Sequence, residues 1–376
     1  MRRAIVALAA CVVAFLAAST TASASPALRF GIYDEAQTLF STNANGFDTL
    51  KTLKARILRL NLYWYRVSPS RPQSIADPFD PSYDWSLYDR AVRLAAERGI
   101  RILFSIWGTP DWANGGRGPR NAPTSFQDLE DFAEAAAHRY SGHQPAGAPL
   151  PLVDLWMAWN EPNSPNFLQP QSRRQGDRFV PASPGIYARI CNAVYQGVHT
   201  AGEEEGIGET VACGVTAPRG NNIFRGKRAS ISPILFLRGM KAAGATFDVY
   251  AHHPYNPAGD LVAPNVPPRA RTTVTLGNIN TLIRELNRLY GRQMRLWITE
   301  YGYQTNPPDR IFGVSLKQQA AYLRQAYRIA RRNPRIDMLL WFLLRDEPAV
   351  GRWQSGLMTF KGKRKPAFAA YRATAP

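Results

Sequence analysis

The chain alternates short β-rich runs with amphipathic helical runs from residue 28 to its end, and each kind of run occurs eight times. The β-rich runs are almost continuously apolar, which is typical of strands that are covered on both faces in a parallel sheet. Parallel strands need a crossover connection, and an amphipathic helix is the usual one. Eight such units in 376 residues predict one α/β domain with a (β/α)8 TIM barrel.

The expected strands are 28–33, 55–64, 100–108, 152–160, 210–216, 247–253, 294–299 and 336–343, and the expected helices are 47–54, 85–98, 126–140, 184–200, 233–243, 278–290, 316–332 and 366–373. A doubly wound open sheet is the alternative. That fold would place a glycine-rich phosphate-binding turn after the first strand, whereas the segment from Gly31 to Glu35 contains one glycine. The longest irregular stretches follow strand ends, where a barrel builds its substrate groove.

The first 24 residues have the pattern of an export signal. Arg2 and Arg3 precede an apolar run from Ala4 to Ala18, and a small-residue cleavage site ends at Ala24. Residues 25–376 are therefore the expected (β/α)8 domain, and we expect it outside the cytoplasm: secreted, with periplasmic or cell-surface placement as alternatives. A lipid anchor on Cys11 is a further alternative. No other segment reaches the ~20 uninterrupted apolar residues of a membrane span, so no transmembrane segment is expected.

The formal net charge is +18, and it falls by two units if Arg2 and Arg3 leave with the signal. Clusters such as Arg173-Arg174 and Arg331-Arg332 would suit an acidic glycan or a cell surface, or would be a solvated surface without a partner. No zinc-ligand spacing or nucleic-acid module accompanies the charge, so nucleic acid is not an expected partner. Two cysteines remain beyond the signal, Cys191 and Cys213, and a disulfide or two buried thiols both fit an exported chain.

Two glutamates close apolar, strand-like runs. Glu161 ends the run from Leu152, and Glu300 ends the run from Gln293. Closure of a barrel would bring both side chains to opposite walls of one pocket. Such a pair of carboxyl groups is typical of a glycosidase. A separation of ~5–5.5 Å between the two carboxyl groups gives retention of anomeric configuration, and ~6.5–9.5 Å gives inversion. An ion pair with a surface arginine is the alternative role of each glutamate.

These two runs resemble the retaining (β/α)8-barrel glycoside hydrolases of clan A, closest to families 39 and 5, over essentially the whole chain after the signal. Trp159-Asn160-Glu161-Pro162-Asn163 is similar to the acid/base motif of that clan, and Ile298-Thr299-Glu300-Tyr301-Gly302 is similar to its nucleophile strand. The resemblance implies that Glu161 is the general acid/base, that Glu300 is the nucleophile, and that Asn160 binds the sugar 2-hydroxyl. The third expected strand departs from many family 5 enzymes, because it ends without a histidine.

Four further residues match positions of the clan. The resemblance implies that Arg59 keeps the nucleophile ionised, that His253 and Tyr255 contact the sugar and the nucleophile, and that Trp341 forms the aromatic floor of a sugar subsite. The alternatives are an ordinary surface arginine for Arg59 and simple core filling for Trp341. The adjacent pair His252-His253 could suggest a metal, but neighbouring residues on a strand point to opposite faces. Neither a metal nor another cofactor is therefore expected.

Aromatic residues gather near the expected strand ends, and their apolar faces suit sugar rings. They are Tyr33, Trp64, Tyr65, Trp107, Trp112, Tyr255, Tyr301, Tyr303 and Trp353, and the nearby acids Asp34, Glu35, Asp346 and Glu347 could add hydroxyl contacts. The resulting hypothesis is a secreted glycosidase that hydrolyses O-glycosidic bonds of a polysaccharide or oligosaccharide by double displacement. The alternatives are an inactive barrel that binds polysaccharide, or a basic surface protein that binds another acidic polymer.

Overall fold

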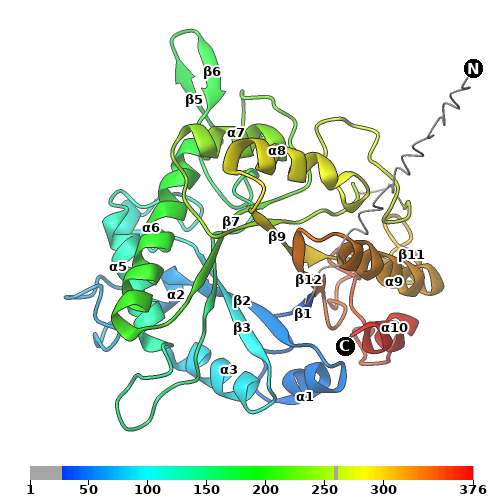
Figure 1. Ribbon diagram of the computed structural model, residues 1–376, viewed down its shortest axis with the longest axis horizontal. Helices are drawn as coiled ribbons and strands as arrows, with labels where there is room; N and C mark the ends of the chain where they lie inside the picture. Colours follow the sequence, from blue (N-terminus) through cyan, green and yellow to red (C-terminus); the bar gives the residue numbers. More distant parts are fainter. Residues whose placement is uncertain (1–27, 258–260, 376) are drawn as a thin grey trace, which may run out of the picture.

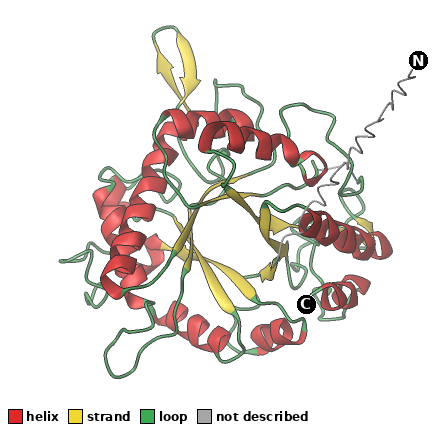
Figure 2. Cartoon of the chain, in the orientation of Figure 1, coloured by secondary structure: helices red, strands yellow, loops and turns green. Residues whose placement is uncertain are grey.

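The computed structural model describes residues 28–257 and 261–375, and its centre is a closed barrel of eight parallel strands in the order β1-β12-β9-β8-β7-β4-β3-β2. The strands form the inner ring in Figure 2, and helices surround them. The barrel strands are β1 (Arg29–Tyr33), β2 (Ile57–Tyr63), β3 (Arg101–Trp107), β4 (Leu155–Ala158), β7 (Thr210–Thr216), β8 (Val249–His252), β9 (Arg295–Tyr301) and β12 (Ile336–Phe342). The expected single-domain (β/α)8 fold is confirmed.

Helices surround the barrel as an outer ring, which can be followed in Figure 1. They are α1 (Asn45–Thr52), α3 (Ser86–Ala96), α5 (Gln127–Arg139), α6 (Ser183–Glu205), α7 (Pro233–Ala242), α8 (Asn280–Tyr290), α9 (Leu316–Arg332) and α10 (Pro366–Thr374), with the short α2 (Trp64–Val67), α4 (Asp111–Asn114) and η1 (Leu276–Asn278) in loops. Each of the eight expected helices has a counterpart within a few residues at either end.

Two small sheets were not expected from the sequence. β5 (Ser172–Gln175) and β6 (Arg178–Pro181) form an antiparallel hairpin that projects from the barrel in Figure 1. β10 (Thr305–Asn306) and β11 (Val314–Ser315) pair over two residues each in the loop after β9. All four strands have only two to four residues, which is too short for the apolar pattern that reveals barrel strands.

The core has two layers, because side chains alternate between the two faces of each barrel strand. The inward-facing residues fill the barrel interior, and they include Leu103, Met157, Trp297, Met338 and Leu340. The outward-facing residues pack against the helices. At the carboxyl end of each strand, the next inward-facing residue lies beyond this packed interior. Its side chain therefore reaches the open end of the barrel, where a site can form.

Cys191 of α6 and Cys213 of β7 form a disulfide, with their Cα atoms 6.0 Å apart. This decides between the two alternatives that the sequence left open. The expected export signal lies outside the described residues. Within the described part of the chain, none of the helices combines the length and apolar character needed to cross a bilayer.

Candidate active site

Glu161 follows β4 in a backbone conformation that is uncommon for residues with side chains. The φ angles of Trp159 and Glu161 are 68° and 36°. Two hydrogen bonds hold this turn: the Trp159 amide donates to the Ile106 carbonyl at 2.8 Å, and the Glu161 amide donates to the Val215 carbonyl at 2.9 Å. Strained backbone that neighbouring strands hold in place is frequent at functional sites. Here it directs the Glu161 carboxyl over the open end of the barrel.

The Glu161 carboxyl is largely buried, with its side chain 18% exposed. Burial raises its pKa to about 7, against the opposing effect of the Arg59 charge. Its Oε1 lies 3.0 Å from Nδ1 of His253. The carboxyl is therefore able to keep a proton near neutral pH and to release it to an acceptor in the cavity.

Glu300 lies within the last two residues of β9 and has a different environment. Nη1 of Arg59 donates to its Oε1 at 2.6 Å, and the Tyr255 hydroxyl donates to its Oε2 at 3.2 Å. The Arg59 side chain is fully buried and that of Glu300 is 9% exposed. A fixed cation on one oxygen and a hydroxyl donor on the other therefore hold the Glu300 carboxyl in one orientation.

Arg59 connects the residues around both carboxyls. While Nη1 binds Glu300, Nη2 donates to Oδ1 of Asn160 at 2.7 Å. Nη1 also lies 3.2 Å from Nε2 of His253, which is 3.1 Å from the Thr299 hydroxyl. Burial lowers the pKa of His253 to about 3, so its ring is neutral. Nε2 then accepts from Arg59, and Nδ1 carries the proton that faces Glu161.

Both carboxyls line one cavity of about 810 Å³ at the open end of the barrel. One carboxylate oxygen of Glu161 and one of Glu300 lie within 4.8 Å of each other. This separation is close to the ~5–5.5 Å of retaining glycosidases and shorter than the ~6.5–9.5 Å that leaves room for a water in inverting ones.

The structure brings six of the seven expected site residues together. Glu161, Glu300, Asn160 and Tyr255 line the cavity. Arg59 and His253 lie beneath it, fully buried, so they act on the carboxyls and on Asn160. Trp341 lies apart: it is buried on the outward face of β12 among the core residues that contact the helices, and its indole donates to the Ser355 carbonyl at 2.9 Å.

Phe342 lines the cavity where Trp341 was expected. Met338 and Leu340 face the barrel interior, and Phe342 continues this alternating series by two residues. The expectation of an aromatic floor from β12 is met by the next residue along the strand, because neighbouring residues point to opposite faces.

A polar wall on the β1 and β2 side combines Tyr33, which was expected from the sequence, with Asn61 and Tyr63, which were not. Asn61 follows Arg59 by two residues on the same face of β2, and its Nδ2 donates to the Tyr33 hydroxyl at 2.7 Å. The Tyr63 hydroxyl donates to Glu35 at 2.6 Å. Asn61, Tyr33 and Tyr63 line the cavity. The sequence did contain a signal for Asn61 and Tyr63. They continue the alternate positions 57 and 59 of β2, so they face the same side of the strand as Arg59.

Each of the four acids that could have added hydroxyl contacts, or could have been solvated loop acids, has a hydrogen-bond partner within the protein. Asp34 accepts hydrogen bonds from the backbone amides of Leu344 and Arg345, and Glu35 accepts them from the Asn61 backbone amide and the Tyr63 hydroxyl. Asp346 accepts a hydrogen bond from the Lys365 ammonium, and Glu347 accepts one from the Trp353 backbone amide. Five of the expected aromatic residues line the cavity, namely Tyr33, Trp107, Tyr255, Tyr303 and Trp353. The cavity lining does not include Trp64, Tyr65, Trp112 or Tyr301.

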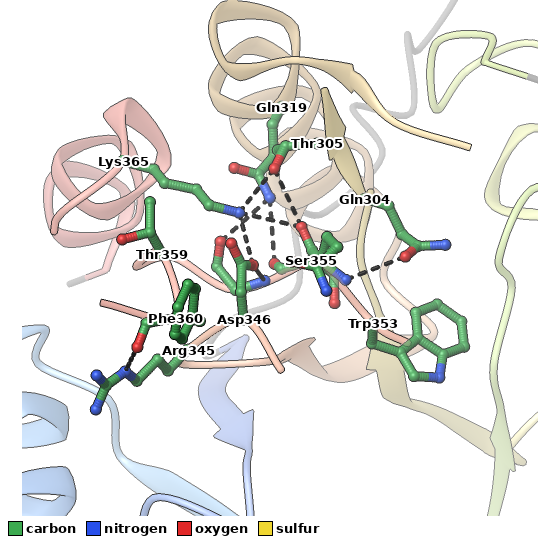
Figure 3. A network of polar contacts seen from close by, with 12 residues as sticks. Gln304, Thr305, Gln319, Arg345, Asp346, Trp353, Ser355, Thr359, Phe360 and Lys365 are labelled. Atoms are coloured by element: carbon green, nitrogen blue, oxygen red, sulfur yellow. Dashed lines mark hydrogen bonds and ion pairs between the residues drawn. The ribbon is translucent and has the colours of Figure 1, made fainter. Parts of the chain in front are cut away.

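Trp353 reaches the cavity from the loop that joins β12 to α10 (343–365), and a buried ion pair anchors that loop. Nζ of Lys365 donates to Oδ1 of Asp346 at 2.7 Å, to the Thr305 hydroxyl at 2.8 Å and to the Gln354 carbonyl at 3.0 Å (Figure 3). The two charged side chains are 1% and 2% exposed. Trp353 then packs 5.4 Å from the Tyr255 ring, centroid to centroid.

Glu161, His253 and Glu300 also have a spacing that could hold a metal ion, with ligand atoms within 4.8 Å of one another. The Arg59 guanidinium already places a positive charge 2.6 Å from Glu300. A second cation beside it would be repelled. The arrangement therefore fits proton transfer and nucleophilic attack by carboxyl groups better than metal binding.

A scan against protein-family models finds no match, and neither does a search of curated proteins. Solved structures do match. A family 39 glycoside hydrolase from the gut symbiont Bacteroides cellulosilyticus WH2 is 18% identical with a TM-score of 0.66, over 93% of this chain and 63% of that one. This chain thus spans less than two thirds of that enzyme.

Two further structures have the same fold. A GH39 β-xylosidase from Caulobacter crescentus is 18% identical with a TM-score of 0.58, over 92% of this chain and 70% of that one. A GH5_18 enzyme from Streptomyces cattleya, solved in complex with GlcNAc, is 14% identical with a TM-score of 0.61, over 94% and 80%. The expected likeness to the barrels of families 39 and 5 is confirmed at the level of the fold.

Proposed function

We propose that the chain is a retaining glycoside hydrolase that cleaves O-glycosidic bonds, with Glu300 as nucleophile and Glu161 as general acid/base. The observation that carries the proposal is the pair of carboxyls in one cavity, with oxygens within 4.8 Å of each other and with opposite environments. Glu161 has a pKa raised by burial, which suits a general acid, whereas Glu300 is held by Arg59 and Tyr255, which suits a nucleophile of fixed orientation. The glycoside hydrolases among the matching structures support the same reaction class.

In the first step, Glu300 attacks the anomeric carbon while the bond from that carbon to the leaving oxygen breaks. Glu161, whose pKa burial raises to about 7, gives its proton to the leaving oxygen. A covalent bond now joins the sugar to Oε1 or Oε2 of Glu300, and Glu161 is ionised.

In the second step, the ionised Glu161 takes a proton from water, and the water oxygen attacks the anomeric carbon. The bond to Glu300 breaks, and the nucleophile is again a carboxylate held by Arg59 at 2.6 Å. Each step inverts the anomeric carbon, so the product keeps the configuration of the bond that was cleaved.

Other residues of the site position these two groups. Arg59 orients Glu300 through one nitrogen and Asn160 through the other, which aims the Asn160 amide into the cavity as a donor to a sugar hydroxyl. Neutral His253 donates from Nδ1 to Glu161. Phe342 and Trp353 supply apolar surface for sugar rings.

The proposed substrate is a polysaccharide or oligosaccharide, since a cavity of about 810 Å³ with several aromatic residues has room for more than one sugar. We further propose that the chain is exported and that the signal is cleaved after Ala24. The disulfide between Cys191 and Cys213 supports this placement, because disulfides persist in oxidising compartments. A purified culture-medium protein whose first residue is not Ser25 would contradict the cleavage site.

The test is hydrolysis of a panel of aryl β-glycosides and of neutral and acidic polysaccharides. The release of reducing ends measures the rate of hydrolysis. Wild type should hydrolyse at least one member, and Glu300→Ala should lower kcat on the order of 10⁴-fold or more. Glu285→Gln is the matched control, since Glu285 lies on α8 and pairs with Arg238 outside the barrel. Turnover that survives in Glu300→Ala, or binding of glycans by wild type without any turnover, would refute the proposal.

A further inference from the structure

Two arginines line the cavity in addition to the two proposed catalytic glutamates. Apart from the two proposed catalytic glutamates, its charged lining residues are Arg219 and Arg352, within the part of the chain that the structure describes. The hydroxyl-binding groups of the cavity are neutral, and they include Asn61, Asn160 and Gln304. A guanidinium binds a carboxylate or sulfate more strongly than a neutral hydroxyl, so two arginines in the lining favour a ligand that carries negative charge.

Arg219 lies on the Glu161 side of the cavity. It follows β7, which is the neighbour of β4 in the barrel. The side chain of Asn163, two residues after Glu161, donates to the Arg219 carbonyl at 3.3 Å. This bond fixes the backbone at Arg219 against the acid/base loop, while the arginine itself is exposed.

Arg352 lies on the Glu300 side. It belongs to the β12–α10 loop, and β12 is the neighbour of β9. The next residue, Trp353, packs against Phe342 with ring centroids 5.1 Å apart. Arg352 has a distant ion pair to Glu347 at 3.6 Å, and its side chain is 71% exposed. An exposed pair of this kind has little energy, so the guanidinium is available to an anionic ligand.

The β7–α7 loop (217–232) extends the positive charge beyond the cavity. It contains Arg219, Arg225, Lys227 and Arg228, all exposed, and no acidic residue. The whole chain has a formal net charge of +18. A positive rim on a positive molecule attracts anionic polymers and raises their local concentration.

We propose that the substrate is an anionic glycan, with carboxylate or sulfate groups on sugars that flank the bond to be cleaved. Arg219 binds the acidic group on the Glu161 side, and Arg352 binds the one on the Glu300 side. The inference rests on the proposed glycosidase function and specifies its substrate class. It also separates two uses of arginine in one site: buried Arg59 holds the nucleophile, whereas exposed Arg219 and Arg352 select the ligand.

The test uses the full chain with Glu300→Gln, which keeps the substrate intact, and isothermal titration calorimetry. The probes are oligogalacturonate for carboxylates, chondroitin sulfate oligosaccharide for sulfates, and xylo-oligosaccharide of equal length as the neutral reference. At least one acidic probe should bind more tightly than the neutral one. Arg219→Gln and Arg352→Gln should each weaken it by about tenfold or more, as expected for a lost charged hydrogen bond.

Arg324→Gln is the matched control, because Arg324 is exposed on α9 outside the barrel and its removal lowers the net charge equally. It should leave the affinity within twofold of the parent. Equal weakening by Arg324→Gln, equal affinity for the neutral probe, or equal competition by polyacrylate or single-stranded RNA would overturn the inference.

Turnover by wild type distinguishes the two proposals. Hydrolysis of neutral glycosides that is indifferent to Arg219→Gln would overturn the anionic substrate and leave the glycosidase in place. Tight, arginine-dependent binding of an acidic probe that wild type never hydrolyses would refute the glycosidase function and confirm the recognition of anionic glycans by these arginines.

Discussion

At the scale of single residues, Glu161 makes the activity depend on pH in a defined direction. Its pKa is raised to about 7 by burial, and only the protonated form can donate to the leaving oxygen. The kcat/KM for a substrate with a poor leaving group should therefore fall as pH rises through about 7. A pH profile of kcat/KM measures this, because it reports the titration of the free enzyme.

The control for this prediction is Glu161→Gln with a dinitrophenyl glycoside, whose leaving group needs no proton. The variant should form the glycosyl-enzyme with that substrate, and its kcat/KM should show no alkaline limb near pH 7. Constant kcat/KM in wild type from pH 6 to pH 9 would contradict the assignment of Glu161 as acid.

Arg59 should not be replaceable by lysine, although the charge is the same. Its two terminal nitrogens bind Glu300 and Asn160 at 2.6 Å and 2.7 Å, and a single ammonium cannot reproduce this fork. Arg59→Lys should lower kcat on the order of 10²-fold through misplacement of the nucleophile.

Arg59→Met should in addition lower the free energy of unfolding by about 3–5 kcal/mol, because it leaves the buried Glu300 carboxylate without its cation. Steady-state kinetics and urea unfolding measure the two effects. Near wild-type kcat in Arg59→Lys would show that charge alone suffices and that the fork has no role.

At the scale of elements, the β12–α10 loop depends on the buried Lys365–Asp346 pair (Figure 3). Lys365→Met should lower the free energy of unfolding by about 3–5 kcal/mol, since it leaves Asp346 buried without a cation. The loop also carries Trp353 and Arg352 to the cavity, so KM should rise. Urea unfolding and substrate kinetics check both.

The double variant Lys365→Met/Asp346→Leu separates charge from packing. Removal of both charges eliminates the unpaired carboxylate. The double variant should therefore regain most of the free energy of unfolding that Lys365→Met loses. A double variant as unstable as Lys365→Met would show that the loss comes from packing around the lysine and not from the uncompensated charge.

Most of the fold could be predicted at this scale. The barrel strands and their helices have strong periodic patterns, and their bounds differ from the expected ones by a few residues. The β5–β6 hairpin was missed because its strands, Ser172–Gln175 and Arg178–Pro181, have four residues each and are exposed or half-buried, so neither forms the long buried apolar run of a barrel strand. Trp341 was assigned to the cavity because a sequence motif does not fix which face of a strand a residue occupies; only the inward series of Met338 and Leu340 shows that Phe342 is the lining residue.

At the scale of the whole molecule, the site exists because the barrel closes. Arg59 lies within β2 and Glu300 near the end of β9, whereas Glu161 and His253 lie just beyond β4 and β8. Closure places each of these side chains within hydrogen-bonding distance of at least one other. The sequence predicted that the two glutamates would share a pocket. It could not predict their separation, which depends on the tilt and stagger of strands, and this separation distinguishes retention from inversion.

The most direct test of the account is therefore the configuration of the first product. A substrate found in the glycoside panel is hydrolysed in the spectrometer, and the anomeric proton signals are followed by NMR from the first turnovers. The account predicts that the initial product has the configuration of the cleaved bond and that the other anomer grows in only by mutarotation. Initial release of the opposite anomer would contradict it, because a single displacement by water leaves no role for Glu300 as nucleophile.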